Sequence, residues 1–233
     1  MKSKVSFILI TVTMISFSCS KNINYSEQFK SETAGRYLYH ADDIIDIYYE
    51  DNTLMLRWRE GKIKPVVLDE NTFFVSDMYK KLEFTKHLET NKRYLSIVPE
   101  NAEKSSTYDY LKVDSNYKTP SMHLKDKNYQ KAFEGYLAIK QQDSTSELIN
   151  EWEFNRIGYD FMRQKDYENA LGIFKMNAAL FPTSDNVYDS LADAYLRSGD
   201  SINAYENYVK ALDLNSRNKR AEKFIENYKV KVD

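Results

Sequence analysis

The sequence predicts an α+β protein in which a small antiparallel β-sheet or barrel-like domain precedes an α-helical array. Short aromatic and β-branched runs between positions 33 and 100 are typical of strands. Beyond position 120, apolar residues recur at helical spacing. The helical part also contains two consecutive segments of equal length whose small and large residues match. These three observations divide the chain into a β half and a helical half.

Composition restricts the class of protein. The chain has 233 residues and is 42% hydrophobic, which is enough for a packed core. Six glycines and four prolines, beside 19 tyrosines and 12 phenylalanines, argue against a long disordered linker. The formal net charge is -2, so the basic surface that nucleic-acid binding requires is not indicated. We therefore expect no nucleic-acid partner.

Residues 1–18 have the pattern of a signal peptide. Lys2 and Lys4 precede the apolar run VSFILITVTMISF, which is too short to span a bilayer comfortably. Cys19 follows and is the only cysteine, so no intramolecular disulfide is possible. This pattern resembles a bacterial lipoprotein signal, which implies that Cys19 becomes the lipidated first residue of the mature chain, carrying palmitate, with residues 19–32 as a tether.

The residues around the cysteine refine this resemblance. Ser16 stands where the common lipoprotein pattern has leucine. This looser form of the signal resembles that of Bacteroidota-like sequences, which are rich in Lys, Asn, Ile and Tyr as this sequence is. Ser20 replaces the aspartate that favours inner-membrane retention in the best-known bacterial lipoproteins. The resemblance therefore implies the bacterial cell envelope, with lipid anchoring to the outer membrane and a periplasm-facing chain. Ordinary cleavage, or an uncleaved anchor with a bystander cysteine, is the alternative.

Residues 33–100 are expected to form the antiparallel β domain. Polar residues separate the apolar runs, and Asp51 and Asn52 suit a tight hairpin turn. Leu54, Leu56 and Trp58 alternate with polar residues and would share one face. We expect a meander of six or seven strands, closed or half closed. The runs are GRYLYH, IIDIYYE, TLMLRW, KPVVL, TFFV, LEFTK and RYLSIV.

The β domain carries no recognisable chemical motif. His40 and His87 have no second ligand at a metal-site spacing such as H-E-x-x-H. The sequence therefore predicts no catalytic residue, no metal and no cofactor, and hence no enzyme. An alternative function is a small-molecule or glycan-binding module, in which Tyr37, Tyr49 and Trp58 would line an open end of the β domain.

A polar stretch separates the halves. Residues 101–120 are expected to be a junction that ends at Pro120. Residues 121–150 are expected to supply a packing helix, because apolar residues there recur every three or four positions. They are Tyr129, Ala132, Phe133, Tyr136 and Leu137.

Residues 151–184 and 185–218 form two windows of 34 residues that align without gaps. Asp166 and Asp200 occupy one repeat position, where each would cap the second helix of its repeat. The matched residues are Ile157, Gly158 and Phe161 with Leu191, Ala192 and Tyr195, and Ala170, Phe174 and Ala178 with Ala204, Tyr208 and Leu212. The chain thus resembles a tetratricopeptide-repeat protein, with residues 219–233 as a capping helix and tail.

The resemblance implies a binding surface, because the first helices of successive tetratricopeptide repeats line a concave face. Asp185, Asp189 and Asp193 lie four residues apart, so a protein or peptide partner with a basic segment is expected, the alternative being a solvated acidic face. The lining lacks the Lys/Asn set with which some family members hold a terminal carboxylate. The surface comprises Trp152, Asn155, Tyr159, Met162, Arg163, Asp189, Asp193, Leu196 and Arg197.

A second resemblance covers residues 33–218. The order of AGRYLYH, YQKAFEGYLAIK and the repeats is similar to the C-terminal extension of some bacterial β-lactamase-related serine hydrolases. Those enzymes place a Ser-x-x-Lys pair in a separate catalytic domain, which this sequence does not contain. The predicted function is a non-catalytic, lipid-anchored protein that mediates protein–protein interaction, with an accessory relative of a serine hydrolase as an alternative; the oligomeric state is left open.

Overall fold

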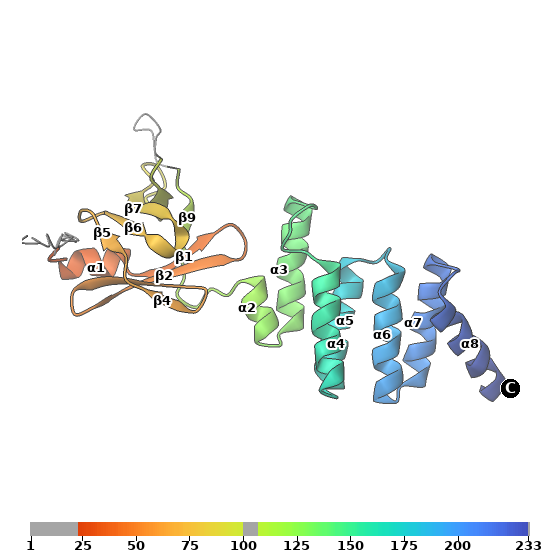
Figure 1. Ribbon diagram of the computed structural model, residues 1–233. Helices are drawn as coiled ribbons and strands as arrows, with labels where there is room; N and C mark the ends of the chain where they lie inside the picture. Colours follow the sequence, from red (N-terminus) through yellow and green to blue (C-terminus); the bar gives the residue numbers. More distant parts are fainter. Residues whose placement is uncertain (1–22, 100–106, 233) are drawn as a thin grey trace, which may run out of the picture. The chain divides into compact units, whose positions relative to one another are not determined.

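The computed structural model describes residues 23–99 and 107–232 (Figure 1). The predicted signal peptide and Cys19 lie outside the described residues. The chain forms two compact units. One contains the described residues up to Tyr37 together with Ile45–Lys112, and the other contains Leu38–Ile44 together with the described residues from Val113. No helix of the described part combines the length and the apolar character needed to cross a membrane.

Residues 19–32, predicted as a tether, include most of a short helix, α1 (Glu27–Thr33). Ser26 begins the helix, because its hydroxyl accepts a hydrogen bond from the Phe29 N–H at 3.1 Å. Thr33 at its end is fully buried, and the Tyr37 hydroxyl donates to the Thr33 carbonyl oxygen at 2.8 Å. Helix α1 is therefore attached to the core of the β unit through its last residue.

The described residues contain nine strands in one sheet, with the order β4-β3-β2-β1-β9-β8-β7-β6-β5. A 3-10 turn, η1 (Ser76–Met78), lies between the sixth and seventh. The strands are β1 (Gly35–Tyr39), β2 (Asp43–Glu50), β3 (Thr53–Trp58), β4 (Gly61–Ile63), β5 (Val66–Val67), β6 (Thr72–Val75), β7 (Lys80–Lys86), β8 (Arg93–Ile97) and β9 (Tyr110–Val113).

Alternating burial explains the strands. Ile45 and Ile47 of β2 are buried, as Leu54 and Leu56 are in the antiparallel strand β3. The turn between these strands consists of two residues with positive φ, Asp51 and Asn52, at 44° and 64°. Two central residues with positive φ match the right-handed twist of a hairpin and suit aspartate and asparagine.

The predicted fold class is wrong for the β half, although the order of a β part followed by helices holds. The sheet is an open, nine-stranded half-barrel rather than a small meander confined to residues 33–100. Its middle strand β9 comes from residues 101–120, which the sequence predicted to be a junction. Both edge strands, β4 and β5, are separated by only two residues, so the sheet curls until these edges lie within roughly 11 Å.

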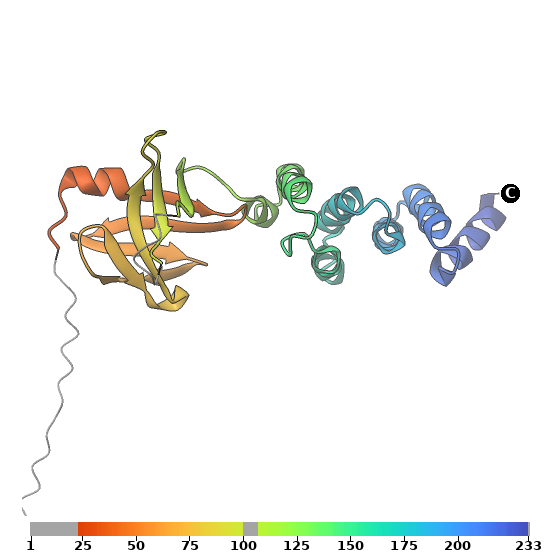
Figure 2. The same ribbon diagram turned by 90° about the horizontal axis from the view of Figure 1, so that it is seen from above.

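The helical unit consists of consecutive antiparallel helix pairs and confirms the tetratricopeptide-like part of the prediction. Helices α4, α6 and α8 begin at residues 151, 185 and 219, a spacing of 34 residues. In Figure 2, α3, α5 and α7 form one row, and α4 and α6 lie on the other side. The helices are α2 (Pro120–Lys125), α3 (Tyr129–Gln142), α4 (Glu151–Arg163), α5 (Tyr167–Leu180), α6 (Asp185–Ser198), α7 (Ser201–Leu214) and α8 (Lys219–Val232).

Helices α2 and α3 form a further, shortened pair with the same internal pattern. Each second helix is preceded by a residue with φ between 60° and 92° and then by an N-cap residue. The side chain of the N-cap accepts a hydrogen bond from the N–H three residues later. The fourth residue of each of these helices is a fully buried alanine. The sets are Lys127, Asn128 and Ala132; Lys165, Asp166 and Ala170; and Gly199, Asp200 and Ala204. The expected packing helix is thus the second helix of a pair.

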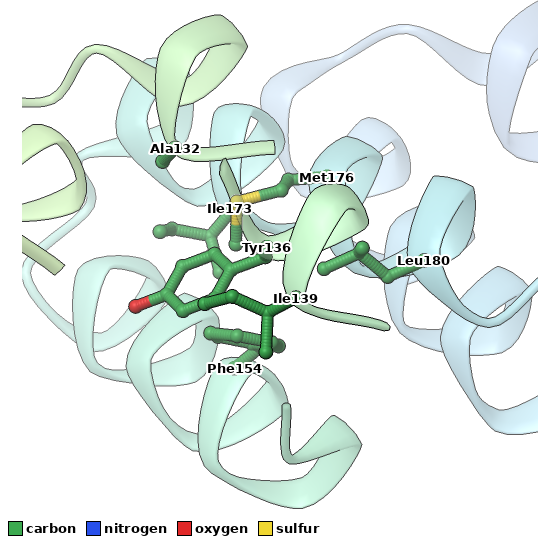
Figure 3. Packing of buried hydrophobic residues seen from close by; sticks show 7 residues of the cluster. All are labelled: Ala132, Tyr136, Ile139, Phe154, Ile173, Met176 and Leu180. Carbon is green, nitrogen blue, oxygen red and sulfur yellow. The ribbon is translucent and has the colours of Figure 1, made fainter. Parts of the chain in front are cut away.

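Apolar clusters lie between neighbouring helices of the helical unit. The first cluster lies between α3, α4 and α5, where the rings of Tyr136 and Phe154 meet edge to face at 5.0 Å (Figure 3). Gly158 of α4 lies so close to Phe174 that an added Cβ would be 2.5 Å from the ring. At the equivalent position of the next repeat, Ala192 is fully buried. Small residues at this position therefore set how closely the two helices of a repeat approach.

We expect Tyr110→Ala to lower the free energy of unfolding of the β unit by about 3–5 kcal/mol, because Tyr110 is fully buried in the middle strand. Chemical denaturation followed by Trp58 fluorescence in a Trp152→Phe background measures this unit alone. Tyr79→Ala, the same change at a side chain that is 86% exposed, is the control and should shift stability by less than about 0.5 kcal/mol. Equal effects would contradict the placement of β9.

Asp200→Ala is expected to lower the thermal midpoint of the helical unit at pH 7, because Asp200 accepts from the Asn203 N–H at 3.1 Å and from its Nδ2 at 2.6 Å. These bonds to Asn203 lower the pKa of Asp200. Its stabilising contribution is present above the usual carboxyl pKa and is lost as the pH falls through the lowered value. The difference in midpoint by circular dichroism should therefore shrink in acid, whereas Asp213→Ala should have little effect at either pH.

Candidate functional site

The first helices of the repeats present one shared face, which we call the first-helix face. Its members stand at equivalent positions, 34 residues apart, on α4, α6 and α8, and α4 contacts α6 directly. It contains Trp152, Asn155, Tyr159 and Arg163 of α4; Asn186, Asp189, Asp193 and Arg197 of α6; and Arg220, Lys223 and Asn227 of α8. Met162 and Leu196, also predicted for the binding surface, stand at its border.

Trp152 is the most exposed large aromatic on this face. It lies in the first turn of α4, after the N-cap Asn150, and its exposed fraction is 71%. Leu148, just before the helix, is 41% exposed. A tryptophan that is left in water loses the favourable free energy of burial, and such side chains are enriched among the residues that dominate binding energy in interfaces.

Other predicted residues of α4 serve the core instead. Met162 is 6% exposed and packs in the cluster that joins α5 to α6. Asn155 is 9% exposed, and its Oδ1 atom has no hydrogen-bond partner among the described residues. Tyr159 is half-buried, with its ring edge to face with Phe174 at 5.2 Å. These three side chains therefore lie mostly beneath the surface of the first-helix face.

Two of the three acidic residues of α6, Asp189 and Asp193, are buried and already paired with cations. Asp189, 9% exposed, accepts from Arg220 Nε and from Asn218 Nδ2, each at 3.1 Å. Asp193, 6% exposed, accepts from Arg197 Nε at 3.0 Å and lies 3.5 Å from Arg220 Nη1. A buried carboxylate needs such partners, because desolvation without them costs several kcal/mol. The chain itself thus neutralises two of the three carboxylates from which a basic partner was expected.

The cations that hold these carboxylates remain in contact with solvent. The side chain of Arg197 is 60% exposed and that of Arg220 is 45% exposed. Arg163, at the position equivalent to Arg197, is 70% exposed and pairs with Asp160. Lys223 is also exposed. The accessible charge of the first-helix face is therefore positive.

Sequence reasoning included Arg163 and Arg197 but missed Arg220 and Lys223. It treated residues 219–233 only as a cap, whereas α8 begins 34 residues after α6 and so occupies the place of another first helix. Extending the repeat spacing by one more unit would have put both side chains on the face.

The residues proposed for a small-molecule site lie in or against the β unit. Tyr37 is fully buried, and the Tyr49 hydroxyl is 2.7 Å from the Thr33 hydroxyl. Burial raises the pKa of Tyr49 to about 12, so its hydroxyl stays protonated at neutral pH. The Arg59 guanidinium lies 4.4 Å from the ring centre of Trp58. Tyr37 and Tyr49 are thus core side chains rather than the lining of an open end.

Within residues 23–99 and 107–232, no group of three or more His, Cys, Asp or Glu side chains is placed to hold a metal ion. The His40 ring lies 3.9 Å from that of Tyr39, and His87 Nδ1 accepts from the Thr90 N–H at 3.3 Å. Both histidines therefore have local contacts of their own.

A groove of about 360 Å³ lies along α2 and α3. Gly135 and Ala138 form part of its wall, and polar side chains of both signs surround them. The polar members are Lys118, His123, Lys131, Glu134 and Gln142. This mixture of charges on one helix pair does not favour a single ligand class.

No family model and no curated protein matches the chain. Among solved structures, the first TPR of Spaghetti (RPAP3) bound to the HSP90 peptide SRMEEVD is similar at 17% identity, over 48% of this chain and 86% of that one, with a TM-score of 0.34. The type III secretion translocator chaperone SycD of Yersinia enterocolitica is similar at 16% identity, over 49% and 89%, with a TM-score of 0.34. MamA MSR-1 is similar at 19% identity, over 42% and 54%, with a TM-score of 0.28.

Proposed function

We propose that this chain is a non-catalytic protein-interaction module whose first-helix face binds a segment of a partner protein. The observation that carries the proposal is the exposed Trp152, which shares this face with a row of exposed cations. An aromatic anchor surrounded by charged groups is the combination that protein interfaces use for affinity and for orientation.

The helix pairs make this face a suitable platform. Each second helix packs through a buried alanine and an aromatic residue, so the first helices are held as a rigid row. When a partner segment binds this rigid row, the receptor loses little conformational entropy. A flexible loop would lose more, because binding would have to order it. The expectation of a basic partner rested on Asp185, Asp189 and Asp193. Asp193 and Asp189 are paired with Arg197 and Arg220, and Asp185 accepts from Asn215 Nδ2 at 3.0 Å, so the chain itself neutralises two of the three carboxylates.

We expect a photo-crosslinking amino acid at position 152 to capture a discrete partner protein in cells, because a ligand on the first-helix face must pass close to this side chain. Position 202 is the matched control, since Ile202 of α7 is similarly exposed, at 66%, but lies on a second helix. Mass spectrometry identifies the product. The same products from both positions, or none from position 152, would contradict the proposed function.

We further propose that a lipid on Cys19 holds the chain at a membrane of the bacterial cell envelope. The support is the sequence alone: Lys2 and Lys4, the apolar run after them, and the single cysteine at the expected processing point. Stable anchoring of a protein to a membrane requires two membrane-binding signals, such as two acyl chains.

Labelled palmitate is expected to enter the wild-type chain and to be absent from Cys19→Ala, because no other thiol is available. Ser20→Ala, which changes the neighbouring residue and leaves the thiol, should keep the label. Gel autoradiography after metabolic labelling measures both variants. Label that persists in Cys19→Ala would exclude this anchor.

A further inference from the structure

We propose that the partner segment is acidic: an extended peptide whose Asp or Glu side chains pair with the cations of α4, α6 and α8. This inference rests on the proposed function, because it names the chemistry of the ligand for the same face. It reverses the charge that the aspartates of α6 indicated. The binding groups are Arg163, Arg197, Arg220 and Lys223, with Trp152 as the apolar contact.

The buried carboxylates hold two of these cations in place. Arg197 donates through Nε to Asp193, and Arg220 donates through Nε to Asp189, while both side chains keep about half of their surface in water. A guanidinium has five N–H donors in a fixed plane, so Arg197, which is held through Nε, still offers its Nη donors. Arg220 directs Nε and Nη2 to Asp189, and its Nη1 lies 3.5 Å from Asp193, so it contributes exposed positive charge rather than free donors. Held cations lose less side-chain entropy when they bind an incoming carboxylate.

The acidic groups near the face do not cancel this charge. The side chains of Asp189 and Asp193 are only 12% and 9% exposed and lie beneath the guanidinium groups. On α8, Glu222 accepts from Lys219 at 2.9 Å, and both Glu222 and Glu226 raise the pKa of Lys219. Glu222 is therefore already paired with Lys219.

On α4, Glu153 and Asp160 also have cationic partners, whereas Glu151 accepts from Ser184 Oγ and Asn186 Nδ2, each at 3.0 Å. Arg156 pairs with Glu153 at 2.6 Å and with Asp160 at 2.9 Å, and Asp160 in turn pairs with Arg163. The positive groups that a ligand can reach are therefore Arg197 of α6, Arg220 and Lys223 of α8, and the N–H groups of Arg163 that do not contact Asp160. Complementarity then favours a negatively charged segment and disfavours a basic one.

The spacing of the helices indicates an extended ligand. Packed helices lie roughly 8–10 Å apart, and an extended chain in the polyproline II conformation advances about 3.1 Å per residue with three residues per turn, so every third side chain points the same way. An acidic residue at every third position would therefore bring one carboxylate to each first helix. Recognition through side-chain carboxylates along the peptide does not need the Lys/Asn set that holds a terminal carboxylate.

The test is fluorescence anisotropy with the purified full chain and two labelled dodecapeptides, one with glutamate and one with lysine at every third position, and serine and leucine between. We expect the glutamate peptide to bind and the lysine peptide not to bind. Binding should weaken between 50 and 300 mM salt, as it must for a charge-dominated contact. Circular dichroism verifies that each variant below is folded.

The charge-reversal pair Arg163→Glu with Lys223→Glu should raise the Kd for the glutamate peptide by at least about tenfold. Neither residue supports a buried carboxylate in the structure, so the fold should survive. The matched control is Lys131→Glu with Lys210→Glu, which changes the net charge equally on the second helices α3 and α7. Its Kd should stay within about twofold of wild type.

Absence of binding by the glutamate peptide, or an equal loss in the control pair, would overturn the acidic assignment. Equal loss in the control would instead implicate the groove along α3, which Lys131 lines. If the lysine peptide binds and Trp152→Ala weakens it, the docking face stands and only its charge preference is wrong. If neither peptide binds and position 152 captures nothing in cells, the proposed function fails as well.

Discussion

The helical unit depends on the close contact between each second helix and its neighbours. Ala132, Ala170 and Ala204 are fully buried, and an aromatic side chain follows each of them four residues later. Because a protein interior tolerates few voids and little overlap, an alanine of this kind permits one narrow range of helix separations. Repeating that contact aligns the first helices, and the alignment creates a continuous face from side chains far apart in the sequence.

The same ion pairs satisfy the buried carboxylates and hold the cations of the first-helix face in place. Asp189 and Asp193 are buried on α6, so they require cations, and α8 and the end of α6 supply them. Each arginine then keeps part of its guanidinium in solvent. Asp189 and Asp193 would form an acidic site if α6 stood alone. With Arg220 of α8 and Arg197 paired to them, the exposed groups at this place are basic.

The β unit depends on a different constraint, which is pairing between distant segments. Strand β9 lies between β1 and β8, and its Tyr110 is fully buried, opposite Leu95. A sheet of this kind is complete only when the chain returns after β8 to fill the middle position. The short helix α1 adds Thr33 to the same core, where it meets the hydroxyl groups of Tyr37 and Tyr49.

The sequence by itself determined the two helix pairs within residues 151–218, because each needs only local spacing, a capping Asp166 or Asp200, and a small residue at a repeated position. It also indicated Trp152 as a surface residue. The tertiary structure decided the position of β9 and the sign of the accessible charge. Both arise from contacts between residues far apart in the chain, such as Arg220 with Asp189, and no local pattern encodes which distant partner a buried carboxylate or an unpaired strand will meet.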